Sequence, residues 1–268
     1  MIKQVDLFSK KPGMSAEDFK NHYENRHVPL LMGLIPRFAQ YRRNFIIPGA
    51  TVEGAHIADT PPPPKFDVIT EVWFDDQATF EKLIDDLKNP AVGDPIAKDE
   101  ENFFDRSKMV IFAMEEYKSP EKELGSAAGA PDDGSMVKMV CMIKRKPGMP
   151  REAFIEYYET GHSKLAAKHL PMIARYHRSY MIPNSKFDAG HIANVPPPPD
   201  IDVMTEMWFR TKADHDALRA ALSDPKLGDM FAKDEEKLFD RSTIQMFLVD
   251  ERVTPKETLQ KSARAKGY

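Results

Sequence analysis

The sequence predicts an α+β fold in which two ferredoxin-like βαββαβ repeats pack sheet to sheet and form one barrel within a single chain. Three observations lead to this prediction: an internal repeat, the same order of hydrophobic patterns in both copies, and a strand with two unlike faces. Shifted against itself by 135 residues, the chain is identical at about 47 of the 113 positions from 3 to 115. Chance self-similarity does not reach this level, so the chain is a duplicated domain.

The two copies are predicted to be domains of ordinary size. We place repeat 1 at residues 1–120 and repeat 2 at 136–255, with a linker at 121–135 and a tail at 256–268. The linker is rich in Gly, Ala, Ser and Pro, which is typical of connecting segments. With 268 residues, of which 41% are hydrophobic, the chain can bury a substantial core.

The first half of each repeat is predicted to run strand, helix, strand. In repeat 1, a strand at 3–9 leads through a Pro-Gly turn into a helix at 15–34. The helix starts with a capping pattern, and its inward face repeats at helical spacing. That face consists of Phe19, Tyr23, His27, Leu30 and Leu34. The second strand, 39–47, is expected to stop at Pro48, because proline has no amide to donate.

The second half is predicted to run strand, helix, strand. A strand at 67–74 precedes a helix that carries Phe80, Leu83 and Leu87 on one face. A short acidic helical turn at 99–104 then leads into the last strand at 109–114. The AKDEE and FDRS segments, present in both copies, are interpreted as exposed helix charge followed by entry into that strand.

The strand at 67–74 has two unlike faces. One face is apolar with a single threonine and suits packing under helices, whereas the other alternates carboxylates with bulky apolar groups: Asp67, Ile69, Glu71 and Trp73. Exposing the apolar groups of such a face to water costs free energy, and burying its carboxylates in a dry core does so too. We therefore expect the two mixed faces to cover each other and to line two internal pockets.

Composition limits the partners and the compartment. The formal net charge is -4 and no basic stripe occurs, so we predict neither a nucleic-acid nor a membrane partner. No long apolar run and no signal peptide are found, which favours a cytoplasmic location. Cys141 is the single cysteine, so an internal disulfide is excluded, and we interpret it as an inert core thiol.

Short motifs recur at equivalent positions of the two copies: KPGM near the start, RHVPLL and GHSKLA at the end of the helix, and LIPRFAQYRRN and HLPMIARYHRS after it. With these motifs the sequence resembles the EthD family of the dimeric α+β barrel superfamily, over nearly the whole chain. The resemblance implies a barrel normally built by two subunits, here fused as a pseudo-dimer. Superfamily members include polyketide cyclases, muconolactone-type isomerases, dehydratases and small monooxygenases, most of which use no metal or organic cofactor. The fold alone does not select one reaction.

Two pairs of histidines are candidate catalytic residues. His27 and His162 lie on the inward helix face and match the histidine of the family, so either could exchange a proton near neutral pH; a structural core histidine is the alternative. His56 and His191 each precede four prolines, HIADTPPPP and HIANVPPPP. A proline run is stiff and could hold the histidine over a barrel mouth, or it could be only a rigid spacer.

Further candidates lie on the predicted strands. Partial burial could make Glu71 and Glu206 useful bases, or they could pair with arginines on the next strand. Substrate binding is assigned to residues that could hold an oxygen or stack on a ring, with plain packing as the alternative for the tyrosines. These residues are Tyr41, Arg43, Trp73, Tyr176, Arg178 and Trp208.

The sequence predicts neither a metal nor an organic cofactor, since it contains no HxH, HExxH, GxGxxG or GxxxxGK[ST] motif. We predict an enzyme that performs proton transfer on a small hydrophobic, oxygenated substrate, aromatic or polyketide-like, as a lyase, dehydratase, isomerase or cyclase in aromatic catabolism or secondary metabolism. A cofactor-free monooxygenase and a noncatalytic ligand carrier for an oxygenase are the alternatives. The protein could be a monomer with an internal pseudo-dimer or a homodimer.

The copies differ at several positions that should border a cavity. Asp6 aligns with Cys141, and the other aligned pairs are His22 with Tyr157, Arg26 with Gly161, Arg42 with His177 and Asn44 with Ser179. One pocket could therefore work while the other supports it.

Overall fold

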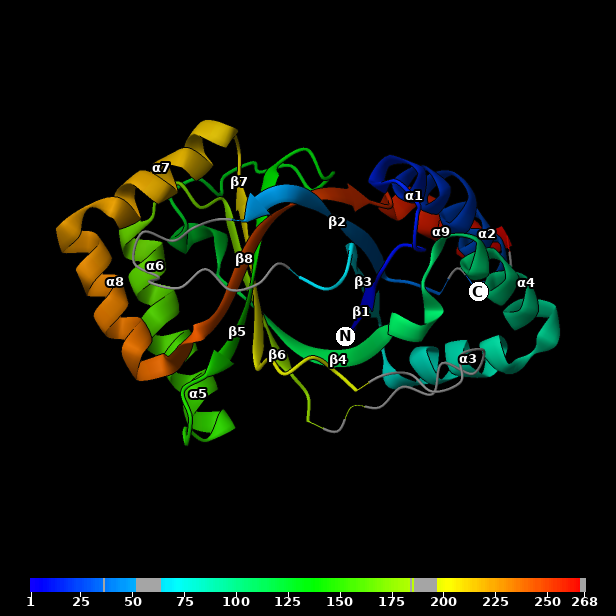
Figure 1. Ribbon diagram of the computed structural model, residues 1–268, viewed down its shortest axis with the longest axis horizontal. Helices are drawn as coiled ribbons and strands as arrows, with labels where there is room; N and C mark the ends of the chain where they lie inside the picture. Colours follow the sequence, from blue (N-terminus) through cyan, green and yellow to red (C-terminus); the bar gives the residue numbers. More distant parts are fainter. Residues whose placement is uncertain (36, 52–63, 184, 186–196, 266–268) are drawn as a thin grey trace.

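A computed structural model describes residues 1–35, 37–51, 64–183, 185 and 197–265. Eight antiparallel strands close into one barrel in the order β1-β3-β2-β8-β5-β7-β6-β4 (Figure 1). The barrel closes where repeat 1 meets repeat 2, through the β2–β8 and β4–β6 pairs. The predicted fold, two βαββαβ repeats packed sheet to sheet, is confirmed. No described helix has both the length and the apolar composition needed to cross a membrane.

Each repeat contributes four strands. In repeat 1 they are β1 (Ile2–Phe8), β2 (Gln40–Thr51), β3 (Val68–Phe74) and β4 (Val110–Lys118). In repeat 2 they are β5 (Val137–Arg145), β6 (Arg175–Met181), β7 (Val203–Phe209) and β8 (Phe239–Val253).

The helices follow the same order in both repeats. Repeat 1 has α1 (Ala16–His22), the π-helix η1 (Tyr23–His27), α2 (Val28–Leu34), α3 (Gln77–Lys88), α4 (Pro90–Phe103) and the short η2 (Arg106–Lys108). Repeat 2 has α5 (Arg151–Tyr157), the π-helix η4 (Tyr158–His162), α6 (Ser163–His169), α7 (Lys212–Ser223) and α8 (Pro225–Leu238). The short η3 (Glu121–Glu123) and α9 (Lys256–Ala265) follow β4 and β8, within the predicted linker and tail.

The helices cover the outside of the barrel on two opposite flanks, α1 to α4 on one and α5 to α8 on the other (Figure 1). Each strand therefore has one face under helices and one face inside the barrel. On β3, Val72 and Phe74 join the core beneath the helices, whereas Ile69 joins the apolar cluster inside the barrel. The predicted parity of this strand is correct.

Three predicted element boundaries differ from the structure. The strand predicted to end at 114 continues as β4 to Lys118. Strand β2 continues through Pro48 to Thr51, because its register against β8 shifts between Ile46 and Thr51 and the ladder does not need the missing amide there. The acidic segment at 99–104 is the end of the 14-residue helix α4. That helix begins at Pro90, and the side chain of Asn89 caps it by accepting a hydrogen bond from the Ala91 amide.

Ligand pockets were predicted in the interior of the barrel, where the structure places a cluster of charges. Glu71 and Glu206 do meet inside the barrel, but both pair with lysines at the starts of β1 and β5. Lys3 Nζ lies 2.5 Å from Glu71 and 2.7 Å from Glu206, and Lys138 Nζ lies 3.0 Å and 2.6 Å from the same two carboxylates. All four side chains are at most 1% exposed. Ion pairs thus occupy the space in which ligand pockets were expected.

Candidate functional site

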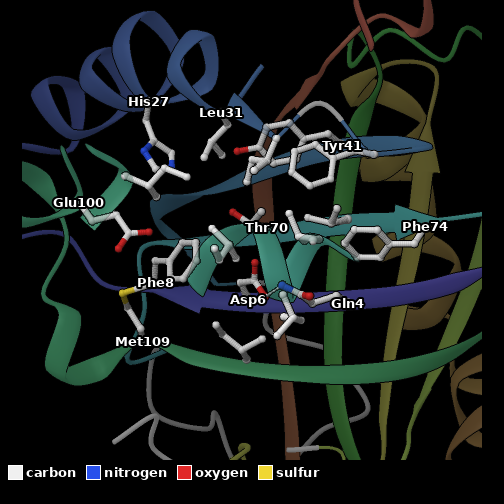
Figure 2. A pocket seen from close by; sticks show the side chains of 18 of the residues that line it. Gln4, Asp6, Phe8, His27, Leu31, Tyr41, Thr70, Phe74, Glu100 and Met109 are labelled. Carbon is white, nitrogen blue, oxygen red and sulfur yellow. Dashed lines mark hydrogen bonds between the residues drawn. The ribbon is translucent and has the colours of Figure 1, made fainter. Parts of the chain in front are cut away.

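A cavity of about 80 Å³ lies in repeat 1 between the outer face of the sheet and the helices (Figure 2). It is large enough for a few water molecules or a small organic group. Most of its walls are apolar, and they include Phe8, Leu31, Phe38, Phe74, Leu83 and Ile96. The polar groups that line it are Gln4, Asp6, Tyr23, His27, Tyr41, Thr70 and Glu100. An apolar pocket with a few convergent polar groups is the usual form of a small-molecule site.

The π-helix η1 presents the principal ionisable group of the cavity. It interrupts the helix predicted at 15–34 for five residues and buries Tyr23 and His27 at its two ends. Single π-turns of this kind are frequent at functional sites. His27 projects from this helix into the cavity, opposite strand β1 (Figure 2).

Asp99 on α4 orients His27. His27 Nδ1 lies 2.9 Å from Asp99 Oδ2, and His22 Nε2 lies 2.9 Å from Asp99 Oδ1. Burial acts to raise the pKa of Asp99, but the hydrogen bonds from the two histidines outweigh it, so this pKa is lowered. An ionised Asp99 favours the tautomer of His27 with its proton on Nδ1, which leaves Nε2 as the basic nitrogen.

Asp99 was not among the predicted site residues, because AKDEE resembles an exposed acidic helix face. The available signal was the exact recurrence of this segment together with the histidines: His162 Nδ1 lies 2.7 Å from Asp234 Oδ2 in repeat 2. There Tyr157 replaces His22, and its hydroxyl donates to Asp234 Oδ1 at 2.7 Å. The His–Asp pair is therefore common to both repeats.

Hydroxyl groups surround the centre of the cavity. Tyr23 Oη and Thr70 Oγ1 are 2.6 Å apart, and Tyr41 Oη donates to Tyr23 Oη over a long 3.5 Å. Burial raises the pKa of both tyrosines well above the ordinary value, so both phenols stay protonated near neutral pH. They can therefore act as hydrogen-bond donors. Whether Tyr41 binds a substrate oxygen or only packs was left open by the sequence, and its substrate-binding role stays a prediction.

Gln4 and Asp6 on β1 form a polar floor of the cavity. Gln4 Nε2 donates to Asp6 Oδ1 at 2.7 Å, and both side chains are less than 10% exposed. In repeat 2, β5 carries Met139 and Cys141 at the two equivalent positions, and both pack in the apolar core. Burial raises the pKa of the Cys141 thiol to about 12, so this group stays neutral, in line with the inert thiol expected from sequence.

The structure does not bring the glutamates and tryptophans of the barrel interior to this cavity. Glu71 was predicted to be a base with a raised pKa. Burial acts to raise this pKa, but Lys138 and Lys3 outweigh the effect and hold it well below its ordinary range. Burial and the nearby Glu71 raise the pKa of Glu206. Arg43 and Arg178 were considered as ion-pair partners of the two glutamates. In the structure, Lys3 and Lys138 form these ion pairs instead.

Trp73 and Trp208 lie in the same interior cluster. Trp73 Nε1 donates to Glu116 at 3.1 Å and Trp208 Nε1 donates to Glu251 at 2.8 Å. Lys3 Nζ lies 4.8 Å from the Trp73 ring centroid, within cation–π range. Their predicted role as walls of a substrate site stays a prediction that this placement does not favour.

Arg43 and Arg178 are engaged by glutamates on the π-helices. Arg43 donates through Nε and Nη2 to Glu24 at 2.9 and 2.6 Å, and Arg178 pairs in the same way with Glu159. Each guanidinium also stacks on its neighbouring tyrosine, Tyr41 or Tyr176, at 4.6 or 4.7 Å from the ring centroid. The arginines thus hold the tyrosines in place from behind.

His56 and His191, with most of the proline runs that follow them, lie outside the described residues. Their predicted role stays a prediction.

One group of potential metal ligands stands out within the described ranges: Glu116, His177 and Glu206 hold ligand atoms within 4.8 Å of one another. Lys3 Nζ lies 3.3 Å from Glu116 and 2.7 Å from Glu206, so an ammonium group already neutralises these carboxylates. Burial lowers the pKa of His177 to about 4. The arrangement is that of an internal ion cluster.

A wider cavity of about 940 Å³ opens beside the small one, at one mouth of the barrel. Phe38 and Tyr41 line both cavities and therefore lie between them. Movement of these two rings would connect the His27 cavity with the outside.

Comparison with known proteins identifies the family. Among solved structures, an anthrone oxidase-like protein superposes with a TM-score of 0.50 at 8% identity, covering 94% of this chain and 92% of that one. A mutant chlorite dismutase from Candidatus Nitrospira defluvii with bound cyanide gives 0.47 at 12% identity, with 98% and 94% covered. At such identities the likeness concerns the fold. No curated protein matches the sequence. The EthD domain model matches residues 11–107 and 146–242, and the chain therefore belongs to the EthD family as a tandem pseudo-dimer.

Proposed function

We propose that this protein is an acid–base enzyme that moves a proton on a small hydrophobic, oxygenated substrate bound in the repeat 1 cavity. The observation that carries the proposal is the His27–Asp99 pair, which places an oriented imidazole at an apolar cavity that also holds neutral phenols. An oriented imidazole is suited to general-base catalysis near neutral pH. A cytoplasmic location is part of the proposal, since the single cysteine cannot form an internal disulfide.

The chemistry follows from the positions of the groups. Nε2 of His27 would accept a proton from a carbon next to a carbonyl, and the carboxylate of Asp99 would stabilise the imidazolium that forms. Tyr41 or Tyr23 would donate a hydrogen bond to the enolate oxygen. Return of the proton to another atom of the substrate gives an isomerase, and loss of a leaving group gives a lyase or dehydratase. Attack of the enolate carbon on a second carbonyl carbon of the same molecule, whose oxygen takes up a proton, gives a cyclase.

Deuterium exchange tests this proposal without knowledge of the natural substrate. Cyclopentanone is a suitable probe, because it is small and hydrophobic and carries its acidic hydrogens next to a carbonyl. In heavy water, the protein is expected to speed the loss of these hydrogens in the proton NMR spectrum. His27→Gln should reduce the catalysed rate by about 10²–10⁴-fold, the usual contribution of a general base. His169→Gln, at the end of α6, is the control and should leave the rate unchanged.

The outcome also separates the alternatives. Equal exchange by wild type and His27→Gln would reject His27 as the base. Binding of the probe without exchange would favour a ligand carrier, and oxygen consumption with the probe present would favour a monooxygenase.

A further inference from the structure

The residues around the repeat 1 cavity have counterparts in repeat 2, with one systematic difference in the two strand residues that form the floor. The His–Asp pair, the central tyrosine and the threonine recur in repeat 2: Tyr158 Oη lies 2.7 Å from Thr205 Oγ1, and Tyr176 Oη donates to Tyr158 Oη at 3.4 Å. The His–Asp pair and the tyrosine and threonine hydroxyls are therefore arranged in the same way in both repeats. The repeats differ in the two strand residues that lie beneath these groups.

In repeat 1 that pair is Gln4 and Asp6. A carboxyl group and an amide are costly to bury unless hydrogen bonds compensate for the lost contact with water. Repeat 2 shows that packing does not require them, because Met139 and Cys141 fill the same strand positions within its apolar core. The same barrel thus contains a polar and an apolar version of one site.

The geometry of the pair is that of an oriented acceptor. Gln4 donates to Asp6 Oδ1 at 2.7 Å and so fixes one carboxylate oxygen on the cavity side of β1. Asp6 lies below and His27 above the space between them (Figure 2). A ligand that occupies this space meets the imidazole of His27 on one side and the carboxyl group of Asp6 on the other, between apolar walls.

We propose that the repeat 1 cavity, and not the equivalent position in repeat 2, binds the ligand, and that Asp6, positioned by Gln4, recognises a hydroxyl group on the ligand. The ligand class is a hydrophobic ring that carries a phenol or an enol. This inference rests on the proposed function for the position of the reacting group, but it concerns recognition and not proton transfer. Hydrogen bonds to a charged acceptor are worth about tenfold or more in affinity.

Phenol and toluene test the inference, because they have nearly the same size and differ in one hydrogen-bonding group. In calorimetric or NMR titrations, wild type should bind one phenol per chain. The double variant Gln4→Met/Asp6→Cys carries the residues that repeat 2 has at these positions. It should lose at least about tenfold in phenol affinity, while its toluene affinity stays within about twofold.

A second variant covers the case in which the double variant does not fold. Asp6→Asn keeps the size of the side chain and removes its charge, so it should also weaken phenol relative to toluene. Thermal unfolding of each variant establishes that the fold is retained. The reciprocal variant Met139→Gln/Cys141→Asp should raise the phenol stoichiometry from one towards two.

Several results would overturn the inference: no phenol binding by wild type, two phenols bound per wild-type chain, or an unchanged phenol-to-toluene preference in Asp6→Asn. The outcome is independent of the exchange assay. If His27-dependent exchange persists while phenol recognition fails, the ligand class is wrong. If phenol recognition holds while exchange is absent, the acid–base function is wrong.

Discussion

At the scale of single residues, the most informative contact is the one between His27 and Asp99. A histidine on the inward face of a helix is ambiguous, because a backbone or side-chain partner can make it purely structural. Here the partner is a carboxylate on a different element, and the histidine also lines a cavity. Base and orienting group together form the arrangement used in many acid–base sites.

Asp99→Asn tests the orienting role of the carboxylate. The amide can still contact the His27 ring but no longer stabilises an imidazolium, so the exchange rate should fall at least about tenfold. Asp234→Asn changes the equivalent residue of repeat 2 and should leave the rate unchanged. Rates measured against pH, together with thermal unfolding, separate this role from a loss of folded protein. Equal losses in the two variants would contradict it.

His177 provides a pH-dependent prediction. Burial lowers its pKa to about 4, against an ordinary value of 6.5, although Glu116 lies 3.6 Å away. Between these pH values the unfolded chain binds a proton that the folded chain does not. The free energy of unfolding therefore decreases as the pH falls from 6.5 to 4, by at most about 3 kcal/mol from this group.

Repeat 1 suggests the matched variant, because Arg42 occupies the position equivalent to His177 and contacts Glu251. His177→Arg should pair with Glu116 and remove this part of the acid sensitivity. Urea unfolding at several pH values measures it, with His169→Gln as a control that keeps the wild-type slope. A variant curve parallel to wild type across this range would show that His177 does not contribute.

At the scale of helices and strands, the spacing of apolar residues was the source of the correct predictions. The order βαββαβ and the two faces of β3 follow from apolar spacing, and both are correct. The π-helices were not predicted, since one extra residue per turn leaves Tyr23 and His27 close to the spacing of an α-helix. The length of α4 was missed as well, because Pro90 and Pro95 suggest a break, although Pro90 begins the helix and Pro95 lies inside it.

The site itself depended on contacts between distant elements. His27 and Tyr41 were identified from their pattern, but Asp99 lies 72 positions from His27 along the chain and no local signal joins them. The mixed faces of β3 and β7 were interpreted as pocket walls. That interpretation did not include Lys3 and Lys138, which lie at the starts of two other strands and neutralise Glu71 and Glu206. The pairing of charges inside a barrel depends on which strands come together when it closes. The pattern of one strand therefore does not predict it.

At the scale of the whole molecule, each repeat completes the core of the other. After β8, the chain crosses to repeat 1: the Thr254 amide donates to the Tyr41 carbonyl, and Leu259 on α9 joins the repeat 1 core. Figure 1 shows α9 beside α1 and α2. After β4, Leu124 enters the repeat 2 core in the same manner.

This exchange predicts a single cooperative unfolding transition for the chain. Leu259 is 3% and Leu124 is 6% exposed, so Leu259→Ala and Leu124→Ala should each lower the free energy of unfolding by about 2–5 kcal/mol. The two side chains lie in different cores, so the losses should add in the double variant. Each variant should shift the same transition in chemical denaturation, followed by circular dichroism. Leu259→Met, which nearly conserves volume, is the control. Two separate transitions, with Leu259→Ala shifting only one, would show that the repeats fold independently and that the crossed segments do not couple them.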